Sequence, residues 1–208
     1  MVRSGTLLYE KNPETITAAS FQIIREEVDL SPFGDAAPVA ERIAHAAGDT
    51  SIVSDLVMEG ALMADVRAAL DQGARVVTDS EMTRHAISRR WVPLDQTVCH
   101  IADPETREMA QREGTTRSAI AMRRASDALN GGIAVIGNAP TALFELLAMM
   151  REGVMPAGIV AFPVGFVGAV ESKAALIAFH PEAPFVTLRG RRGGSAMAGA
   201  ALNAIAAA

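Results

Sequence analysis

The sequence predicts an α/β fold, namely a single three-layer domain over residues 1–208 with a mostly parallel sheet covered by helices on both faces. In the last third of the chain, three strand-like apolar runs each end in a glycine-bearing loop that passes directly into a helix-like stretch. The same alternation begins earlier, near residue 75, and it favours right-handed crossovers and parallel pairing. No linker or internal repeat divides the chain, which favours one domain.

The first part of the chain is predicted to be mainly helical. Apolar residues recur near the helical period over 15–27, which indicates an amphipathic helix. A second helix is expected over 38–47, because Gly48 and Asp49 form a typical stop signal. The other elements expected before residue 131 are a strand over 51–58, a helix over 61–72, a strand over 75–78, a helix over 81–88, a strand over 97–102, and helices over 103–114 and 115–130.

Three more strands are expected over 133–136, 158–162 and 185–188, followed by helices that begin at 141, 170 and 195. The last of these helices is alanine-rich and is predicted to pack closely, since alanine is the best helix former. If the three strands lie side by side and parallel, the loops that follow them meet at the carboxyl edge of one sheet, where open α/β folds place their ligands. The sequence therefore predicts one crevice that attracts anions.

Two of these loops carry groups suited to anions. The loop Gly137-Asn138-Ala139-Pro140 offers backbone N–H groups and an asparagine amide at the positive end of a helix, although a tight turn needs the same residues. The loop from Arg189 to Ser195 holds three arginines and three glycines, so its backbone can approach a ligand while guanidinium groups pair with its oxygens. A solvated basic loop is the alternative interpretation.

One histidine is a candidate proton donor. At about 100° per residue, Val39 and Ile43 fall on one face of the helix over 38–47, whereas His45 lies with Glu41 and Arg42 on the other. An exposed histidine beside Glu41 is one interpretation of this arrangement. A general acid is the other, because the unperturbed pKa of histidine allows proton donation near neutral pH.

Composition and motifs argue against several classes of protein. The net charge of −5 disfavours a nucleic-acid surface, and no apolar window is long enough to span a membrane. The single cysteine, Cys99, cannot form an internal disulfide, so a reducing, cytoplasmic location is expected. The chain has no metal-ligand spacing, no phosphate-binding Walker motif and no nucleophile elbow, so neither a metal nor another cofactor is predicted.

An ordered set of segments is far more specific than any one motif. It comprises 9–13 with 20–27, 41–49, 116–119, 136–143, 163–173 and 190–195. With this set the chain resembles the precorrin-8X methylmutase family of corrin-ring (vitamin B12) biosynthesis over nearly its whole length. The resemblance implies a cofactor-free isomerase that moves a methyl group from C-11 to C-12 of precorrin-8X to give hydrogenobyrinate, usually described as a [1,5]-sigmatropic shift.

The resemblance also implies roles for particular residues. His45 would protonate a ring nitrogen, and the enzyme would be a homodimer with the corrinoid between its subunits. Hand-over of the product to neighbouring pathway enzymes is also expected. The substrate is a flat, apolar macrocycle edged with carboxylates, so an apolar slot rimmed by cationic and hydrogen-bonding groups is expected. The implied substrate-binding residues are Ser20, Thr83, Arg117, Ser118, Asn138, Lys173, Arg191, Arg192 and Ser195.

Two other functions fit the same loops. A non-catalytic corrinoid-binding carrier could sequester a labile pathway intermediate with the same residues. A nucleotide- or phosphate-binding α/β protein has similar generic loops, but the chain lacks a phosphate-specific motif. Whether the natural substrate contains cobalt is left open by the sequence.

Overall fold

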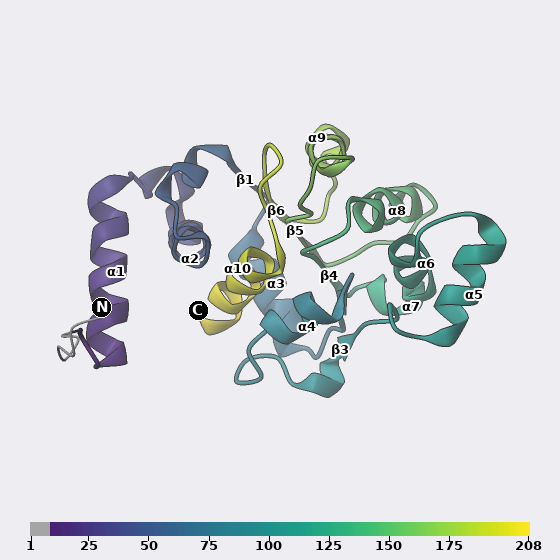
Figure 1. Ribbon diagram of the computed structural model, residues 1–208, viewed down its shortest axis with the longest axis horizontal. Helices are drawn as coiled ribbons and strands as arrows, with labels where there is room; N and C mark the ends of the chain where they lie inside the picture. Colours follow the sequence, from purple (N-terminus) through teal and green to yellow (C-terminus); the bar gives the residue numbers. More distant parts are fainter. Residues whose placement is uncertain (1–8) are drawn as a thin grey trace, which may run out of the picture.

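The computed structural model describes residues 9–208, which form one α/β domain around a six-stranded sheet of order β1-β6-β5-β4-β2-β3 (Figure 1). Neighbouring strands are parallel, except that β1 is antiparallel to β6. The prediction of a mostly parallel sheet is confirmed, while residues 1–8 of the predicted domain lie outside the described ones. The strands are β1 (Leu56–Glu59), β2 (Val76–Thr78), β3 (Thr97–Val98), β4 (Ile133–Ile136), β5 (Gly158–Ala161) and β6 (Phe185–Leu188).

The helices follow the expected order along the described chain. The α-helices are α1 (Pro13–Glu27), α2 (Ala37–Ala47), α3 (Leu62–Asp71), α4 (Glu81–Ala86), α5 (Pro104–Glu113), α6 (Arg117–Arg124), α7 (Ser126–Leu129), α8 (Pro140–Arg151), α9 (Ala169–Phe179) and α10 (Ser195–Ala207). Three short 3-10 helices are η1 (Ser31–Ala36), η2 (Thr50–Asp55) and η3 (Leu94–Gln96). Within residues 9–208, none of the helices is long and apolar enough to cross a membrane.

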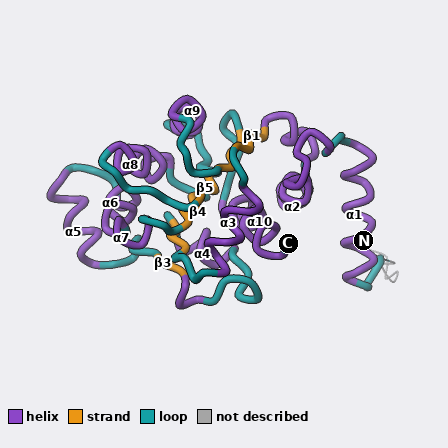
Figure 2. Tube along the Cα trace, turned by 180° about the vertical axis from the view of Figure 1, so that it is seen from behind, coloured by secondary structure: helices purple, strands orange, loops and turns teal. Residues whose placement is uncertain are grey.

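Two apolar clusters lie on opposite faces of the sheet, which confirms the three-layer arrangement. On one face, Val135, Val160 and Val186 pack with buried side chains of α2, α3 and α10. On the other face, Ala134 and Ile159 pack with those of α6, α8 and α9. Alternate residues of each central strand thus enter different clusters, as the two-residue period of a strand requires. Figure 2 shows the strands running between these two groups of helices.

The N-terminal helix α1 lies apart from the sheet and packs on α2 (Figures 1 and 2). A small third cluster joins them, built around Ile24, Ala44 and Val53. Helix α2 in turn packs on α10, whose small residues allow a close approach. The helices α1 and α2 therefore form a unit that reaches the sheet through α10.

Three sequence predictions differ from the structure. The strand expected over 51–58 begins only at Leu56, because the Asp49 side chain accepts a hydrogen bond from the Ser51 N–H (2.9 Å) and caps η2. The strand over 97–102 shrinks to two residues, since β3 is an edge strand paired only with the short β2. The helix over 115–130 is divided into α6 and α7 at Ala125, where ψ is 12°.

Candidate functional site

Strands β4, β5 and β6 are neighbours and parallel, so the three glycine loops meet at one edge of the sheet as predicted. The Val164 N–H donates to the Asn138 carbonyl (3.3 Å), and the Gly165 N–H donates to the Arg191 carbonyl (3.3 Å). Gly193 is required at this junction, because a Cβ there would lie 2.4 Å from the Phe162 carbonyl oxygen. These contacts make the loops one continuous surface, which we call the carboxyl edge.

The backbone N–H groups at the start of α8 bind a carboxylate of the protein. The buried carboxylate of Asp79 accepts hydrogen bonds from the backbone N–H groups of Gly137 (3.0 Å), Asn138 (2.8 Å) and Ala139 (2.6 Å). These N–H groups therefore have an acceptor within the chain, which fits the tight-turn interpretation of this loop. The Asn138 residue remains exposed at the surface of this turn. Asp79 follows β2, the strand beside β4, and its position at a strand end was the available sequence signal.

Thr83 and Ser195 belong to the same buried network. The Thr83 hydroxyl donates to Asp79 (3.0 Å) and lies 2.9 Å from the Ser195 hydroxyl. Thr83 is fully buried and Ser195 nearly so. A Cβ on Gly137 would lie 2.6 Å from the Thr83 hydroxyl oxygen, which explains the glycine. Their role as substrate contacts stays a prediction, and the fold gives both hydroxyls internal partners.

Lys173 and Arg192 also have partners within the chain, Lys173 in the interior and Arg192 at the partly exposed surface. The fully buried ammonium of Lys173 donates to the Arg192 carbonyl (2.6 Å), and burial lowers the Lys173 pKa to about 8, opposed by the charge of Asp55. The Arg192 guanidinium pairs with Asp49 (2.6 Å) and Asp55 (2.7 Å), and it donates to the Ser51 hydroxyl (3.0 Å). Sequence reasoning could not show that these cations have carboxylate or carbonyl partners within the chain.

The exposed part of the carboxyl edge is apolar with a cation beside it. Phe166 is 85% exposed and Val167 is 89% exposed, and they are joined by the half-exposed Val164 and Val170. The Arg191 guanidinium lies over the Phe166 ring, 5.4 Å from its centroid. We call these five residues the platform. Exposed apolar groups of this size mark ligand or partner surfaces. Phe166 and Val167 belong to the sequence motif 163–168, but the sequence analysis gives their side chains no role.

Arg117 and Ser118 lie at the start of α6, where Arg117 is exposed. The Thr116 hydroxyl, which caps α6, donates to the Thr141 hydroxyl in the first turn of α8 (2.8 Å). The first turn of α6 is thus held beside that of α8, which begins at the carboxyl edge. This placement brings Arg117 to the same end of the domain as Asn138.

His45 is exposed on α2, as predicted. Its ring meets the Phe21 ring edge-on, with centroids 5.2 Å apart. It lines a hollow of ≈ 470 Å³ between α1 and α2, whose other lining residues are Ser20, Ile23, Ile24, Glu27, Ala44, Gly48, Asp49 and Thr50. The structure thus brings His45 and Ser20 together, and the Ser20 hydroxyl donates to the Ile16 carbonyl (2.9 Å).

The predicted exposed position of Glu41 beside His45 is wrong. Glu41 is 8% exposed, and Arg25 of α1 pairs with its carboxylate at 2.7 Å. The interface between α1 and α2, invisible in the helical period, buries this side chain. Arg42, from the same turn, instead lies over the Phe21 ring, 4.7 Å from its centroid.

Asp49 connects the His45 hollow to the carboxyl edge. It lines the hollow and also accepts the hydrogen bond from Arg192 of the β6–α10 loop. Hydrogen bonds from Ser51 and the charge of Arg192 lower the pKa of the Asp49 carboxyl, so it is an anion at neutral pH. The imidazole therefore lies one helical turn from a residue that the glycine loops hold directly.

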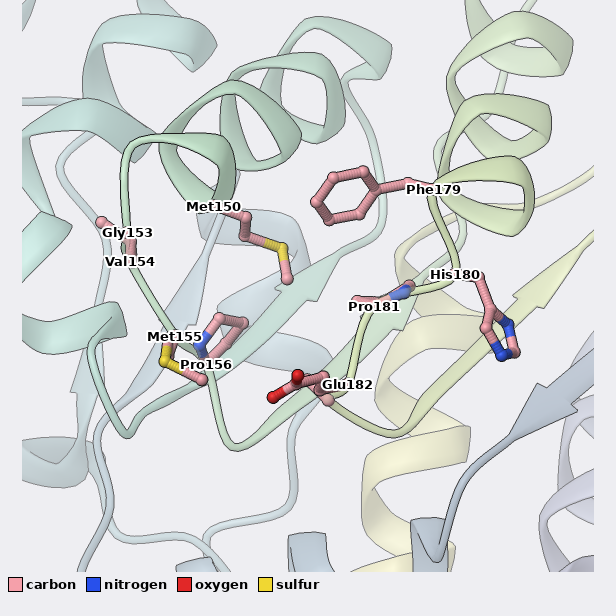
Figure 3. Close-up of a pocket in the computed structure, with 10 residues that line it drawn as sticks. Met150, Gly153, Val154, Met155, Pro156, Phe179, His180, Pro181 and Glu182 are labelled. Atoms are coloured by element: carbon pink, nitrogen blue, oxygen red, sulfur yellow. The ribbon is translucent and has the colours of Figure 1, made fainter.

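A separate cavity of ≈ 330 Å³ lies at the opposite, amino edge of the strands. Figure 3 shows Met150, Phe179 and Glu182 around it, while His180 turns away. It contains none of the predicted site residues. Among residues 9–208, no three His, Cys, Asp or Glu side chains are grouped to hold a metal ion, and the predicted lack of a metal stays a prediction.

The chain is similar to known proteins over most of its length. A family model described as precorrin-8X methylmutase matches residues 15–208. A precorrin-8X methylmutase of Sinorhizobium sp is 44% identical over 99% of this chain and 95% of the relative, and one of Pseudomonas aeruginosa is 42% identical over 95% and 97%. A crystal structure of precorrin-8X methyl mutase from Thermus thermophilus has a TM-score of 0.82 at 31% identity, covering 93% of this chain and 95% of that one.

Proposed function

The chain belongs to the precorrin-8X methylmutase family, and we propose that His45 is the general acid of its reaction. The protein is an isomerase of cobalamin biosynthesis with precorrin-8X methylmutase activity. The family implies precorrin-8X as the substrate.

The reaction that we propose moves one methyl group within the macrocycle. The bond from the methyl carbon to C-11 breaks while a bond to C-12 forms, so no methyl donor is consumed and the product is hydrogenobyrinate. His45 in its protonated form donates to a ring nitrogen, which draws electron density from the adjoining carbons and favours migration. The proton returns to His45 when the product rearranges its double bonds, so atoms and charge balance.

The flat ring of the substrate is proposed to lie on the platform. Phe166 and Val167 are exposed and offer apolar contact, and the exposed Arg191 and Arg117 are the proposed partners of carboxylates at the margin of the ring. A hydrogen bond to a charged group contributes about 1.5–3 kcal/mol, so a few such contacts suffice for binding despite the net charge of −5. Asn138 and Ser118 are proposed as neutral hydrogen-bonding partners at the same end of the domain.

A second copy of the chain is the proposed cover for the platform. Side chains exposed by 85% and 89% on adjacent residues are unusual for a surface that faces water. A homodimer with the corrinoid between its subunits would bury them and exclude water from the ring. A single catalytic domain over 1–208 is part of this proposal, while cytoplasmic location and hand-over of the product to neighbouring enzymes stay predictions.

The observation that carries the His45 proposal is its place on the wall of the hollow, beside Ser20 and one turn from Asp49. We expect His45→Ala to bind the corrinoid while conversion falls by roughly 10²–10⁴-fold, the usual contribution of a positioned proton donor. Conversion is measured by the spectral change when precorrin-8X is added. His85→Ala, in an exposed histidine of α4, is the matched control and should convert normally. Full activity of His45→Ala would remove the proton-donor role.

The same assay separates the enzyme from the carrier. A carrier would bind precorrin-8X without the spectral change of isomerisation. The comparisons favour the enzyme, since the relatives described above are named as methylmutases.

A further inference from the structure

A cluster of charged groups joins three parts of the chain that are distant in sequence. Arg192 of the β6–α10 loop bridges Asp49, which follows α2, and Asp55, which precedes β1. The Lys173 ammonium of α9 donates a hydrogen bond to the Arg192 carbonyl. We call these four residues the Arg192 clamp.

The backbone at Arg192 is held firmly in place by its neighbours. The Lys173 side chain is fully buried, and its hydrogen bond fixes the Arg192 backbone. The next residue, Gly193, lies so close to the Phe162 carbonyl that a Cβ would not fit, and the Gly194 N–H donates to that same carbonyl (2.8 Å). The Arg192 guanidinium therefore projects from a fixed point of the carboxyl edge.

The other side of the clamp is continuous with the His45 turn. The Gly48 N–H donates to the His45 carbonyl (3.2 Å), and the Asp49 N–H donates to the Ala44 carbonyl (3.3 Å). Gly48 ends the helix with φ of +62°, a conformation that glycine adopts readily. A displacement of Asp49 would thus be transmitted through this capped turn to the imidazole.

The clamp fixes the positions of its side chains more than it stabilises the folded state. The side chains of Arg192, Asp49 and Asp55 are 41%, 42% and 39% exposed, and ion pairs so open to water contribute little to folding. One guanidinium held by two carboxylates nevertheless fixes both direction and distance, because its donors form a rigid planar fork. Helices α1 and α2 otherwise reach the sheet through α10.

We propose that Arg192 is a positioning residue that sets His45 relative to the platform by holding Asp49 and Asp55. Arg192 contacts these carboxylates and leaves the substrate carboxylates to Arg191 and Arg117. The inference rests on the proposed role of His45, and it replaces the expectation that Arg192 binds the substrate.

The test compares Arg192→Lys and Asp49→Asn with the wild-type enzyme on precorrin-8X. A lysine keeps the charge but cannot bridge two carboxylates as a fork, and an asparagine keeps an oxygen that can cap η2. Each change should lower kcat by about 10²-fold, the effect of a misplacement of roughly 1 Å, with KM within about twofold. The double variant should lose no more than the worse single variant, because both break one contact.

Asp103→Asn is the matched control. The Asp103 side chain is similarly exposed (37%), and its ion pair with Arg124 (2.7 Å) lies outside the clamp. Its kcat should not change. A raised KM with unchanged kcat in Arg192→Lys would assign Arg192 to the substrate, and a lowered Tm with unchanged kcat would make it merely structural. Either result would overturn the proposal.

A readout independent of activity keeps the two proposals distinguishable. In protein labelled with ¹³C-histidine, the His45 ring signal should shift in Arg192→Lys and Asp49→Asn but not in Asp103→Asn. An unmoved His45 signal would refute the positioning role even if kcat fell. If His45→Ala were fully active while these signals shifted, the proton-donor proposal would fail and the clamp would stand as a structural coupling.

Discussion

Two regions of the carboxyl edge carry similar sequence signals but have opposite structures. At the β4–α8 loop, the helix N-terminus is filled by the buried Asp79. At the β5–α9 loop, Phe166 and Val167 stand in solvent beside Arg191. Both loops contain glycine and both begin helices. The comparison teaches that a donor-rich turn is a ligand site only if the fold supplies no partner of its own.

The largest expected effect tests the filled region. Asp79→Ala would leave three backbone N–H groups at the start of α8 without their acceptor, and those of Gly137 and Ala139 are buried. Each unsatisfied group costs about 1–3 kcal/mol, so we expect the free energy of unfolding to fall by about 3 kcal/mol or more. Urea unfolding measures this. Asp103→Ala, which breaks the partly exposed contacts of Asp103 with Arg124 and His100, should cost within about 1 kcal/mol.

A change in the exposed region is expected to affect substrate binding more than stability. Phe166→Ala removes an 85% exposed ring, so the free energy of unfolding should change by less than about 0.5 kcal/mol. The ring's contact with the macrocycle or with the second subunit would be lost, and we expect KM for precorrin-8X to rise about tenfold, equivalent to roughly 1.4 kcal/mol.

Met82→Ala is the matched control for the platform, because Met82 is 74% exposed on α4. It should leave both stability and KM unchanged. If Met82→Ala raised KM as much as Phe166→Ala, the platform would not be the binding surface. Sedimentation of Phe166→Ala separates the two causes, since loss of a dimer would appear there.

The sequence predicted the fold better than the site, and particular residues explain why. The strands over 133–136 and 185–188 coincide with β4 and β6, because continuous apolar runs between turn residues are local signals. The sequence places Lys173 and Arg192 among the predicted rim groups because it shows charges but not their partners. Arg192 meets Asp49 and Asp55 across 143 and 137 residues of chain, a separation that no local period encodes.

The hydrogen bonds of Asp79 and Thr83 cannot be predicted from the sequence either, because their partners are also distant along the chain. Asp79 lies 58 residues from Gly137, and Thr83 lies 112 residues from Ser195. Strand order is what brings β2 beside β4 and so places the carboxylate under the turn. Glycine positions were more informative, since Gly137 and Gly193 mark the places where backbones approach too closely for a Cβ.

The smallest expected effect concerns Lys173, the buried cation of α9. Burial lowers the Lys173 pKa to about 8, whereas the unfolded chain keeps the ordinary value of 10.5. Between these values the unfolded state binds the proton and the folded state does not, so stability rises with pH through this window. Relative to Lys173→Met, the wild-type free energy of unfolding should rise by about 1 kcal/mol from pH 7 to pH 9.

The pH dependence is measured by urea unfolding of both proteins at several pH values. Asp55 attracts the charged ammonium and opposes the shift, so in Asp55→Asn the Lys173 pKa should fall further and the rise should begin at lower pH. Parallel curves for wild type and Lys173→Met would mean that water reaches the ammonium. In that case Lys173 would belong with the exposed platform rather than with the filled interior, and the contrast between the two regions would not hold at α9.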